Sequence, residues 1–163
     1  MCVNAVIDEM ARSSGATPAD FPFPTNQLAR DLYIAVNGQD PADPSAQGTM
    51  PLKMFAWWQQ NAILGYRLKT AIPVQADSEY ELRRVVESVG YVGLIVRLSE
   101  AQQNAGPWDY VPGSPTWAEH AVLVDEYGPD PLDCTSWGER QPIMSGFIQQ
   151  QTLAAFNFQL IKD

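Results

Sequence analysis

The apolar periodicity of the chain changes at Gly90, and this change constrains the fold more than any other feature. Before Gly90 the apolar residues recur mostly at helical spacing. After it come short segments rich in β-branched and other apolar residues, as is typical of strands. Helical segments followed by antiparallel strands predict an α+β chain. A length of 163 residues suits one domain with a substantial core.

Four helices are predicted in the first part of the chain. Ser78 and Glu81 have the spacing of a capping box, and Gly90 provides a stop for the helix that they begin. The first helix carries an apolar stripe of Val3, Val6, Ile7 and Met10. The expected helices cover Cys2 to Ser14, the residues from Thr25 to Gly38, those from Thr49 to about Ala62, and those from Ser78 to Gly90.

Three strands are predicted in the second part of the chain. They cover residues 91–98, 120–127 and 132–137, the last two forming a hairpin about a turn rich in proline and glycine. Two more apolar segments follow, at 143–148 and 153–161. The second of these fits the helical and the strand period equally well, so its type stays open.

The charge balance excludes two classes of partner. Nineteen acidic and ten basic side chains leave a net charge of -9. Nucleic acids and anionic membranes both require a basic face, so neither is an expected partner. No apolar run approaches the roughly 18 residues of a membrane span, and no signal peptide follows Met1.

The candidates for covalent chemistry are few, because the chain has two cysteines and one histidine. Cys2 stands at the start of a predicted helix, where the positive end of the helix dipole stabilises a thiolate. His120 begins a predicted strand, and a thiolate beside an imidazole is the working pair of cysteine hydrolases. The alternative is structural: Cys2 as a small buried apolar residue and His120 as a histidine whose hydrogen bonds are satisfied within the fold.

Several segments together resemble the papain-like cysteine peptidases, in particular their short bacterial and phage-borne branch. The main matches are His120 to Val124, which resembles the histidine hairpin, and Ser136 to Gly138, which resembles the Asn-Ser-Trp-Gly segment. Further matches occur in the same order along the chain at Gly38, Asp40, Pro41, Asp43, Pro44, Gly48, Thr49, Leu52, Trp58, Trp108, Trp117, Met144 and Phe147.

The resemblance implies one papain-like domain over residues 1–163, with a helical lobe over about 1–90 and an antiparallel sheet lobe over about 91–163. It implies that Cys2 attacks a peptide or amide bond and that His120 acts as base and then as acid, across a cleft between the lobes. The implied partner is a peptide or protein substrate, with no cofactor and no metal. The implied location is the cytoplasm or a virion.

The chain also departs from the family pattern. Thr135 stands where the family has the asparagine that orients the imidazole, so Thr135 or Ser136 is expected to hold the ring. Strand alternation puts Asp133 and Thr135 on one face and Cys134 and Ser136 on the other. Glu119 replaces a glycine common before the histidine, and no segment before Met1 provides the family's oxyanion donor.

These departures keep a second function open. The chain is then a catalytically impaired papain-like body that serves as a structural or binding protein, for example with protein partners in a phage particle. Cys134, in contrast to Cys2, is expected to be buried and inert.

The sequence offers two metal sites and one aromatic cluster as further alternatives. Cys2, His120 and Cys134 are three soft zinc ligands, but they lack the close paired spacing of zinc sites. Asp40 and Asp43 resemble part of a calcium loop, but Pro41 interrupts the alternation of ligands, so turns are the better interpretation. The tryptophans at 57, 58 and 108 are expected in the core and the cleft wall.

Overall fold

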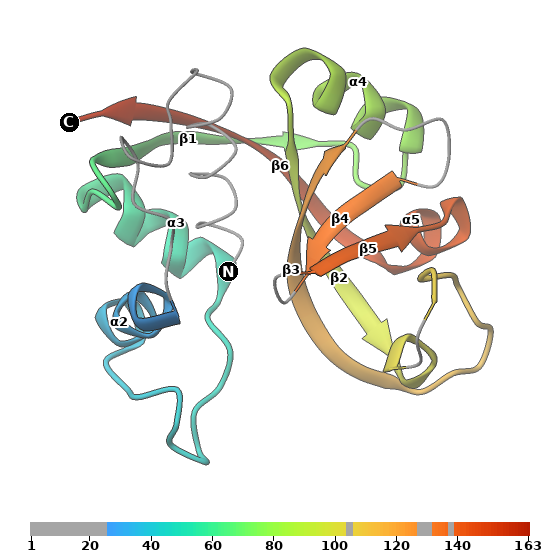
Figure 1. The fold of residues 1–163 in the computed structure, drawn as a ribbon, viewed down its shortest axis with the longest axis horizontal. Helices are drawn as coiled ribbons and strands as arrows, with labels where there is room; N and C mark the ends of the chain where they lie inside the picture. Colours follow the sequence, from blue (N-terminus) through green and yellow to red (C-terminus); the bar gives the residue numbers. More distant parts are fainter. Residues whose placement is uncertain (1–25, 104–105, 127–131, 137–138) are drawn as a thin grey trace.

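The computed structural model describes residues 26–103, 106–126, 132–136 and 139–163 (Figure 1). Its helices are α2 (Asn26–Asn37), α3 (Pro51–Gln60), α4 (Glu79–Val89) and α5 (Ser145–Gln151), with a short 3-10 helix η1 (Glu100–Gln103). Its strands are β1 (Tyr66–Val74), β2 (Val92–Ser99), β3 (Thr116–Glu126), β4 (Leu132–Ser136), β5 (Glu139–Ile143) and β6 (Thr152–Lys162).

Three of the predicted helices are confirmed, as α2, α3 and α4. The capping box of α4 forms as expected, because the Ser78 hydroxyl accepts a hydrogen bond from the Glu81 backbone N–H at 3.3 Å. Gly90 ends this helix in the left-handed conformation at φ 94°, which glycine adopts without a Cβ penalty. The helix predicted over Cys2 to Ser14 lies outside the described residues.

The predicted strands are confirmed as β2, β3 and β4, and the undecided segment near the C-terminus is a strand, β6. The six strands form one sheet in the order β1-β6-β2-β3-β4-β5, and each neighbouring pair is antiparallel. The first part of β6 pairs with β2, and its later part pairs with β1. Pairing on both sides selects the strand conformation of a segment whose own periodicity fits either type.

The expected papain-like architecture, a helical lobe followed by a separate sheet lobe, is wrong. Strand β1 lies between α3 and α4 in the chain, and it is part of the same sheet as the later strands through its pairing with β6. Figure 1 shows the β1–β6 ribbon running from the sheet across α3. The reason for the difference is that β1 joins the sheet through β6, whose paired residues lie more than eighty positions away, and local periodicity does not reveal such pairing.

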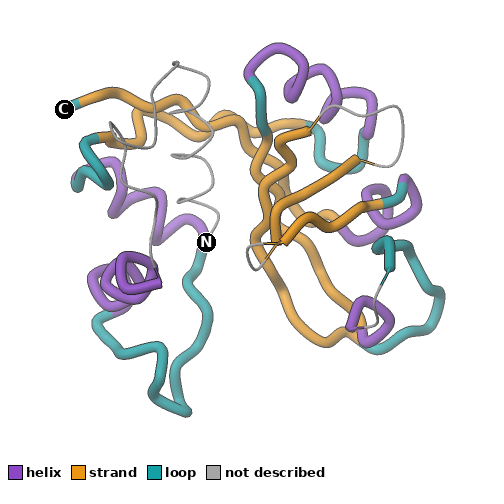
Figure 2. The backbone as a smooth tube through the Cα atoms, viewed as in Figure 1, coloured by secondary structure: helices purple, strands orange, loops and turns teal. Residues whose placement is uncertain are grey.

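Two apolar cores lie on opposite faces of this sheet. Along β3, Val122 and Val124 pack into one core while Leu123 packs into the other, as strand alternation requires. The first core is covered by α4 and α5 and the second by α3, with α2 beyond it, as the helices in Figure 2 show. Within the described part of the chain, no helix is both long and apolar enough to cross a membrane.

Candidate functional site

The sole histidine lies on β3, at the point where this strand passes the end of β4. Strand β4 pairs with β3 from Leu123 onward, so His120 stands just beyond the paired region. Its Nε2 lies 3.1 Å from the Oγ of Ser136, the last residue of β4. A hydrogen bond between these two atoms fixes the orientation of the imidazole.

The protein environment keeps the His120 ring neutral. Burial lowers the pKa of His120 from 6.5 to about 4, because desolvation disfavours the imidazolium ion. At neutral pH the ring therefore has one protonated and one unprotonated nitrogen. A neutral imidazole accepts a proton, which is the first task of a general base.

Strand alternation separates the two residues expected to hold the imidazole. Ser136 is buried on the same side of β4 as Leu132 and Cys134, whereas Thr135 is half-buried on the other side. Thr135 contacts the Asp125 carboxylate instead, with its hydroxyl 3.4 Å from Oδ2. The alternation expected for this strand is thus confirmed, and Ser136 is the residue that the structure brings to His120.

Cys134 is buried among the residues of the first core, as expected. Burial raises the pKa of its thiol to about 12, so it is protonated at neutral pH. An inert thiol at this position agrees with the prediction that Cys134 has no chemical role.

The other cysteine, Cys2, lies outside the described residues, so its predicted role as nucleophile remains a prediction. Cys2 is also one of the three candidate zinc ligands, so the set of Cys2, His120 and Cys134 lies partly outside the described residues. Within the residues that the structure describes, no group of three or more histidine, cysteine or carboxylate side chains is arranged to hold a metal ion.

An open pocket of about 590 Å³ lies beside His120, and we call it the histidine pocket. One wall comes from the segment Gln47–Pro51 that leads into α3, and the other from β2 and β3. It is lined by Gln47, Gly48, Thr49, Met50, Pro51, Ile95, Glu119, His120 and Ala121. The pocket gives a ligand access to the strand that carries the histidine.

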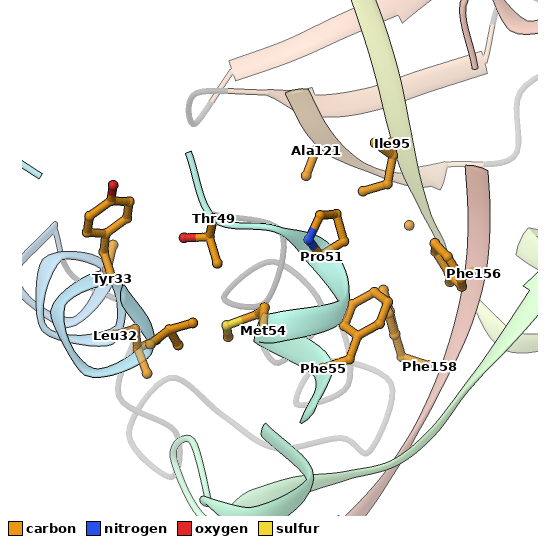
Figure 3. Close-up of a pocket in the computed structure, with 13 residues that line it drawn as sticks. Leu32, Tyr33, Thr49, Pro51, Met54, Phe55, Ile95, Ala121, Phe156 and Phe158 are labelled. Atoms are coloured by element: carbon orange, nitrogen blue, oxygen red, sulfur yellow. The ribbon is translucent and has the colours of Figure 1, made fainter. Parts of the chain in front are cut away.

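A second pocket of about 180 Å³ adjoins the first, and we call it the apolar pocket (Figure 3). Its residues come from α2, the segment before α3, α3 itself and three strands: Ala29, Leu32, Tyr33, Val36, Thr49, Pro51, Met54, Phe55, Gly93, Ile95, Ala121, Phe156 and Phe158. Figure 3 shows Phe55 beside Phe156 and Phe158, whose ring centroids lie 5.2 and 5.4 Å from that of Phe55. Edge-to-face rings of this kind form a rigid wall.

The two pockets are continuous, because four residues line both of them. Thr49 precedes α3 and Pro51 is the first residue of that helix, while Ile95 and Ala121 are cross-strand partners on β2 and β3. The two pockets therefore adjoin at these four residues.

Hydrogen bonds hold the segment that forms the outer wall. The Tyr33 hydroxyl donates to the Gln47 carbonyl, and Asn37 Nδ2 donates to Thr49 Oγ1 at 2.6 Å. Both contacts tie the segment to α2, so the wall is positioned by a helix.

Asp40 and Asp43 lie in turns, as the sequence favours. The backbone N–H of Ala42 donates to the Asp40 carboxylate at 2.9 Å, and that of Ser45 donates to the Asp43 carboxylate at 2.8 Å. These are the side-chain-to-backbone hydrogen bonds of Asx turns. Among the aromatic residues, Trp58 and Trp108 are buried as expected.

Sequence reasoning missed most of the residues that line the apolar pocket. The sequence predicts α2, but periodicity does not say which surface its apolar residues Leu32 and Val36 face. Phe156 and Phe158 were part of the segment of undecided type. Glu119 was noticed as a departure from a family pattern and not as a pocket residue.

In comparisons with known proteins, no protein-family model and no curated protein matches the sequence.

Proposed function

We propose that the protein is a thiol hydrolase that cleaves peptide or amide bonds, with Cys2 as the nucleophile and His120 as the general base. The observation that carries this proposal is the His120–Ser136 pair, 3.1 Å apart, on a strand whose residues Glu119 to Ala121 also line an open pocket. A neutral imidazole held by a second side chain is the arrangement that activates a nucleophile. The cytoplasm is the location that suits this activity.

The proposed reaction has two stages. The Cys2 sulfur attacks the carbonyl carbon, its proton passes to Nδ1 of His120, and the C–N bond breaks as the departing amine takes up that proton. Water then attacks the thioester, gives a proton to His120, and the proton returns to sulfur as the acid leaves. Nδ1 is the nitrogen for this transfer because Nε2 is paired with Ser136.

The burial of His120 suits the first step of this scheme. The low pKa of the ring keeps it unprotonated before the thiol arrives. A thiolate formed beside the ring is an opposite charge, which raises the pKa of the imidazole again and stabilises the ion pair. Ser136 acts here as a positioning residue, because it reaches the reaction only through His120.

The test is the rate of Cys2 alkylation by iodoacetamide against pH, followed by mass mapping. We expect the Cys2 thiol to have a pKa below the ordinary value of about 8.5. His120→Ala should slow the reaction at pH 6 about tenfold, since a pKa unit is a factor of ten in thiolate. Ser136→Ala should slow it less.

Thr135→Ala is the matched control, because Thr135 is the neighbouring hydroxyl on the other side of β4. It should leave the alkylation profile unchanged. A Cys2 profile with an ordinary thiol pKa that His120→Ala does not move would rule out the pair. Faster labelling of Cys134 than of Cys2 would contradict the assignment of the two thiols.

The apolar pocket favours a second candidate, a binding protein without turnover. Its rigid aromatic wall and its position between helices and sheet suit an apolar side chain of a partner protein and require no nucleophile. A role as a structural or binding component of a phage particle is the form of this candidate. Absence of the Cys2–His120 pair in the alkylation test would favour it.

A further inference from the structure

The histidine pocket has a charge that neither proposed function uses. Of the nine residues that line it, Glu119 alone has a formal charge at neutral pH, because burial keeps His120 neutral. Glu119 lies on the same face of β3 as Ala121, since the two residues are two positions apart in a regular stretch of strand. Its carboxylate is thus on the face where the two pockets meet.

Within the part of the chain that the structure describes, the ion-pair partner of this carboxylate is a weak one. Arg97 is the cross-strand partner of Glu119 on β2, and its Nη2 lies 4.0 Å from Oε1. Their side chains are 50% and 64% exposed, respectively. An exposed pair at this distance contributes little, so the carboxylate stays available to a ligand.

From this arrangement we infer that Glu119 selects a positively charged group next to the apolar side chain of the bound peptide. The inference rests on the proposed peptide substrate, and it names the substrate class: an apolar residue followed or preceded by arginine or lysine. The apolar side chain occupies the apolar pocket. The continuity of the two pockets through Ile95 and Ala121 then brings the neighbouring residue to Glu119.

A guanidinium or ammonium group meets this requirement by charge. Charge-assisted hydrogen bonds from a guanidinium to a carboxylate are about twice as strong as neutral ones. Pro51, Ile95 and Ala121 form an apolar surface between the two subsites, along which the methylene stem of a long basic side chain can lie.

The experiment measures peptide binding in the full chain carrying Cys2→Ala, so that turnover is blocked. The probes are two fluorescein-labelled peptides, Gly-Phe-Arg-Gly-Gly and the same peptide with citrulline, which is neutral, in place of arginine. Fluorescence anisotropy at low and at physiological salt gives the two dissociation constants. We expect the arginine peptide to bind about two- to fivefold more tightly, which is the upper part of the range for an exposed charged pair.

Three variants assign this preference to one residue. Glu119→Gln should abolish the difference between the peptides. Arg97→Gln should preserve the preference and raise it slightly, because the exposed Arg97 side chain neutralises only a small part of the carboxylate charge. Glu100→Gln is the matched control: it removes the same charge from η1, away from both pockets, and should leave the preference unchanged.

Equal affinity for the two peptides, or no binding of either at millimolar concentration, would overturn the inference. So would a preference that survives Glu119→Gln, since attraction by the overall net charge of -9 would then explain it. Failure here is distinguishable from failure of the hydrolase proposal, because the latter is measured as Cys2 alkylation in the absence of any peptide.

Discussion

At the scale of single residues, the chemistry of this protein depends on how burial treats its few titratable groups. The same desolvation that lowers the pKa of His120 raises that of Cys134, because each group is disfavoured in its charged form. His120 thereby becomes an acceptor at neutral pH, and Cys134 becomes an inert thiol. Two groups on adjacent strands are thus given opposite chemical behaviour by one physical effect.

Burial of His120 predicts a dependence of stability on pH. The ring binds a proton at about pH 4 in the folded chain and at about 6.5 when unfolded, so the unfolded chain holds more protons between these values. The free energy of unfolding should therefore fall as the pH drops from 6.5 toward 4. His120→Gln should remove the contribution of this residue to the fall in the free energy of unfolding. That contribution has an upper bound of about 3 kcal/mol and should be smaller than this bound, because the ring is only half-buried.

The measurement is urea denaturation of both proteins at pH 7, 5.5 and 4.5. Carboxylates titrate in the same range, but they are common to the two proteins, so the difference between the curves isolates His120. Identical pH dependence of the two would show that folding does not shift the pKa of the ring.

At the scale of elements, α4 is the helix whose ends are most completely specified by local residues. Its N-terminus has the Ser78 cap, with Glu79 and Glu81 in the first turn where the helix dipole favours negative charge. Glu79 also pairs with Arg83 one turn later and accepts a hydrogen bond from Ser145 at the start of α5. Residues within the helix or at its caps therefore determine where α4 begins and ends, and the Ser145–Glu79 hydrogen bond joins it to α5, which is distant in the chain.

Loss of the cap should destabilise the protein by a predictable amount. Ser78→Ala removes the acceptor of the Glu81 backbone N–H and should lower the free energy of unfolding by about 1 kcal/mol. Ser88→Ala is the control within the same helix, because the exposed Ser88 hydroxyl donates only to the Val85 carbonyl near the C-terminal end. Its effect should stay within about 0.5 kcal/mol, as for most surface changes. Equal losses for the two variants in urea titrations would contradict a capping role.

At the scale of the whole molecule, the sheet is a wall shared by two cores. Strand β6 contributes Ala155 to the first core and Phe158 to the second, and β3 contributes to both in alternation. The pocket beside His120 lies where the face of the second core meets the segment before α3. Because both cores depend on the same strands, neither is expected to persist when the other is lost.

This shared wall predicts cooperative unfolding. Phe147→Ala in the first core and Trp58→Ala in the second should each lower the free energy of unfolding by about 3–5 kcal/mol, as for large core aromatics. Each variant should still unfold in a single transition with an unchanged dependence on urea. Circular dichroism and fluorescence should report the same midpoint. Two separate transitions in either variant would show that the cores fold as independent lobes.

Much of the local structure is determined by the sequence itself. Apolar periodicity was sufficient for α2 and α3, periodicity with a capping box for α4, and β-branched composition for β2, β3 and β4. These predictions succeed because each depends on residues within one turn or one strand of each other. Alternation along β4 also foretold that Thr135 and Ser136 would face opposite ways, and that only one of them could reach His120.

Tertiary structure alone decided the rest. The membership of β1 in the sheet and the strand type of β6 depend on pairing between segments far apart in the chain, and the same long-range pairing overturns a fold built from separate helical and sheet lobes. The packing of α2 and α3 against distant strands also opens the two pockets, whereas the β3–β4 hairpin, which the sequence predicts, brings Ser136 to His120. Local periodicity shows that one face of a helix or strand is apolar. It does not show which other segment covers that face, because that segment is often distant in the sequence.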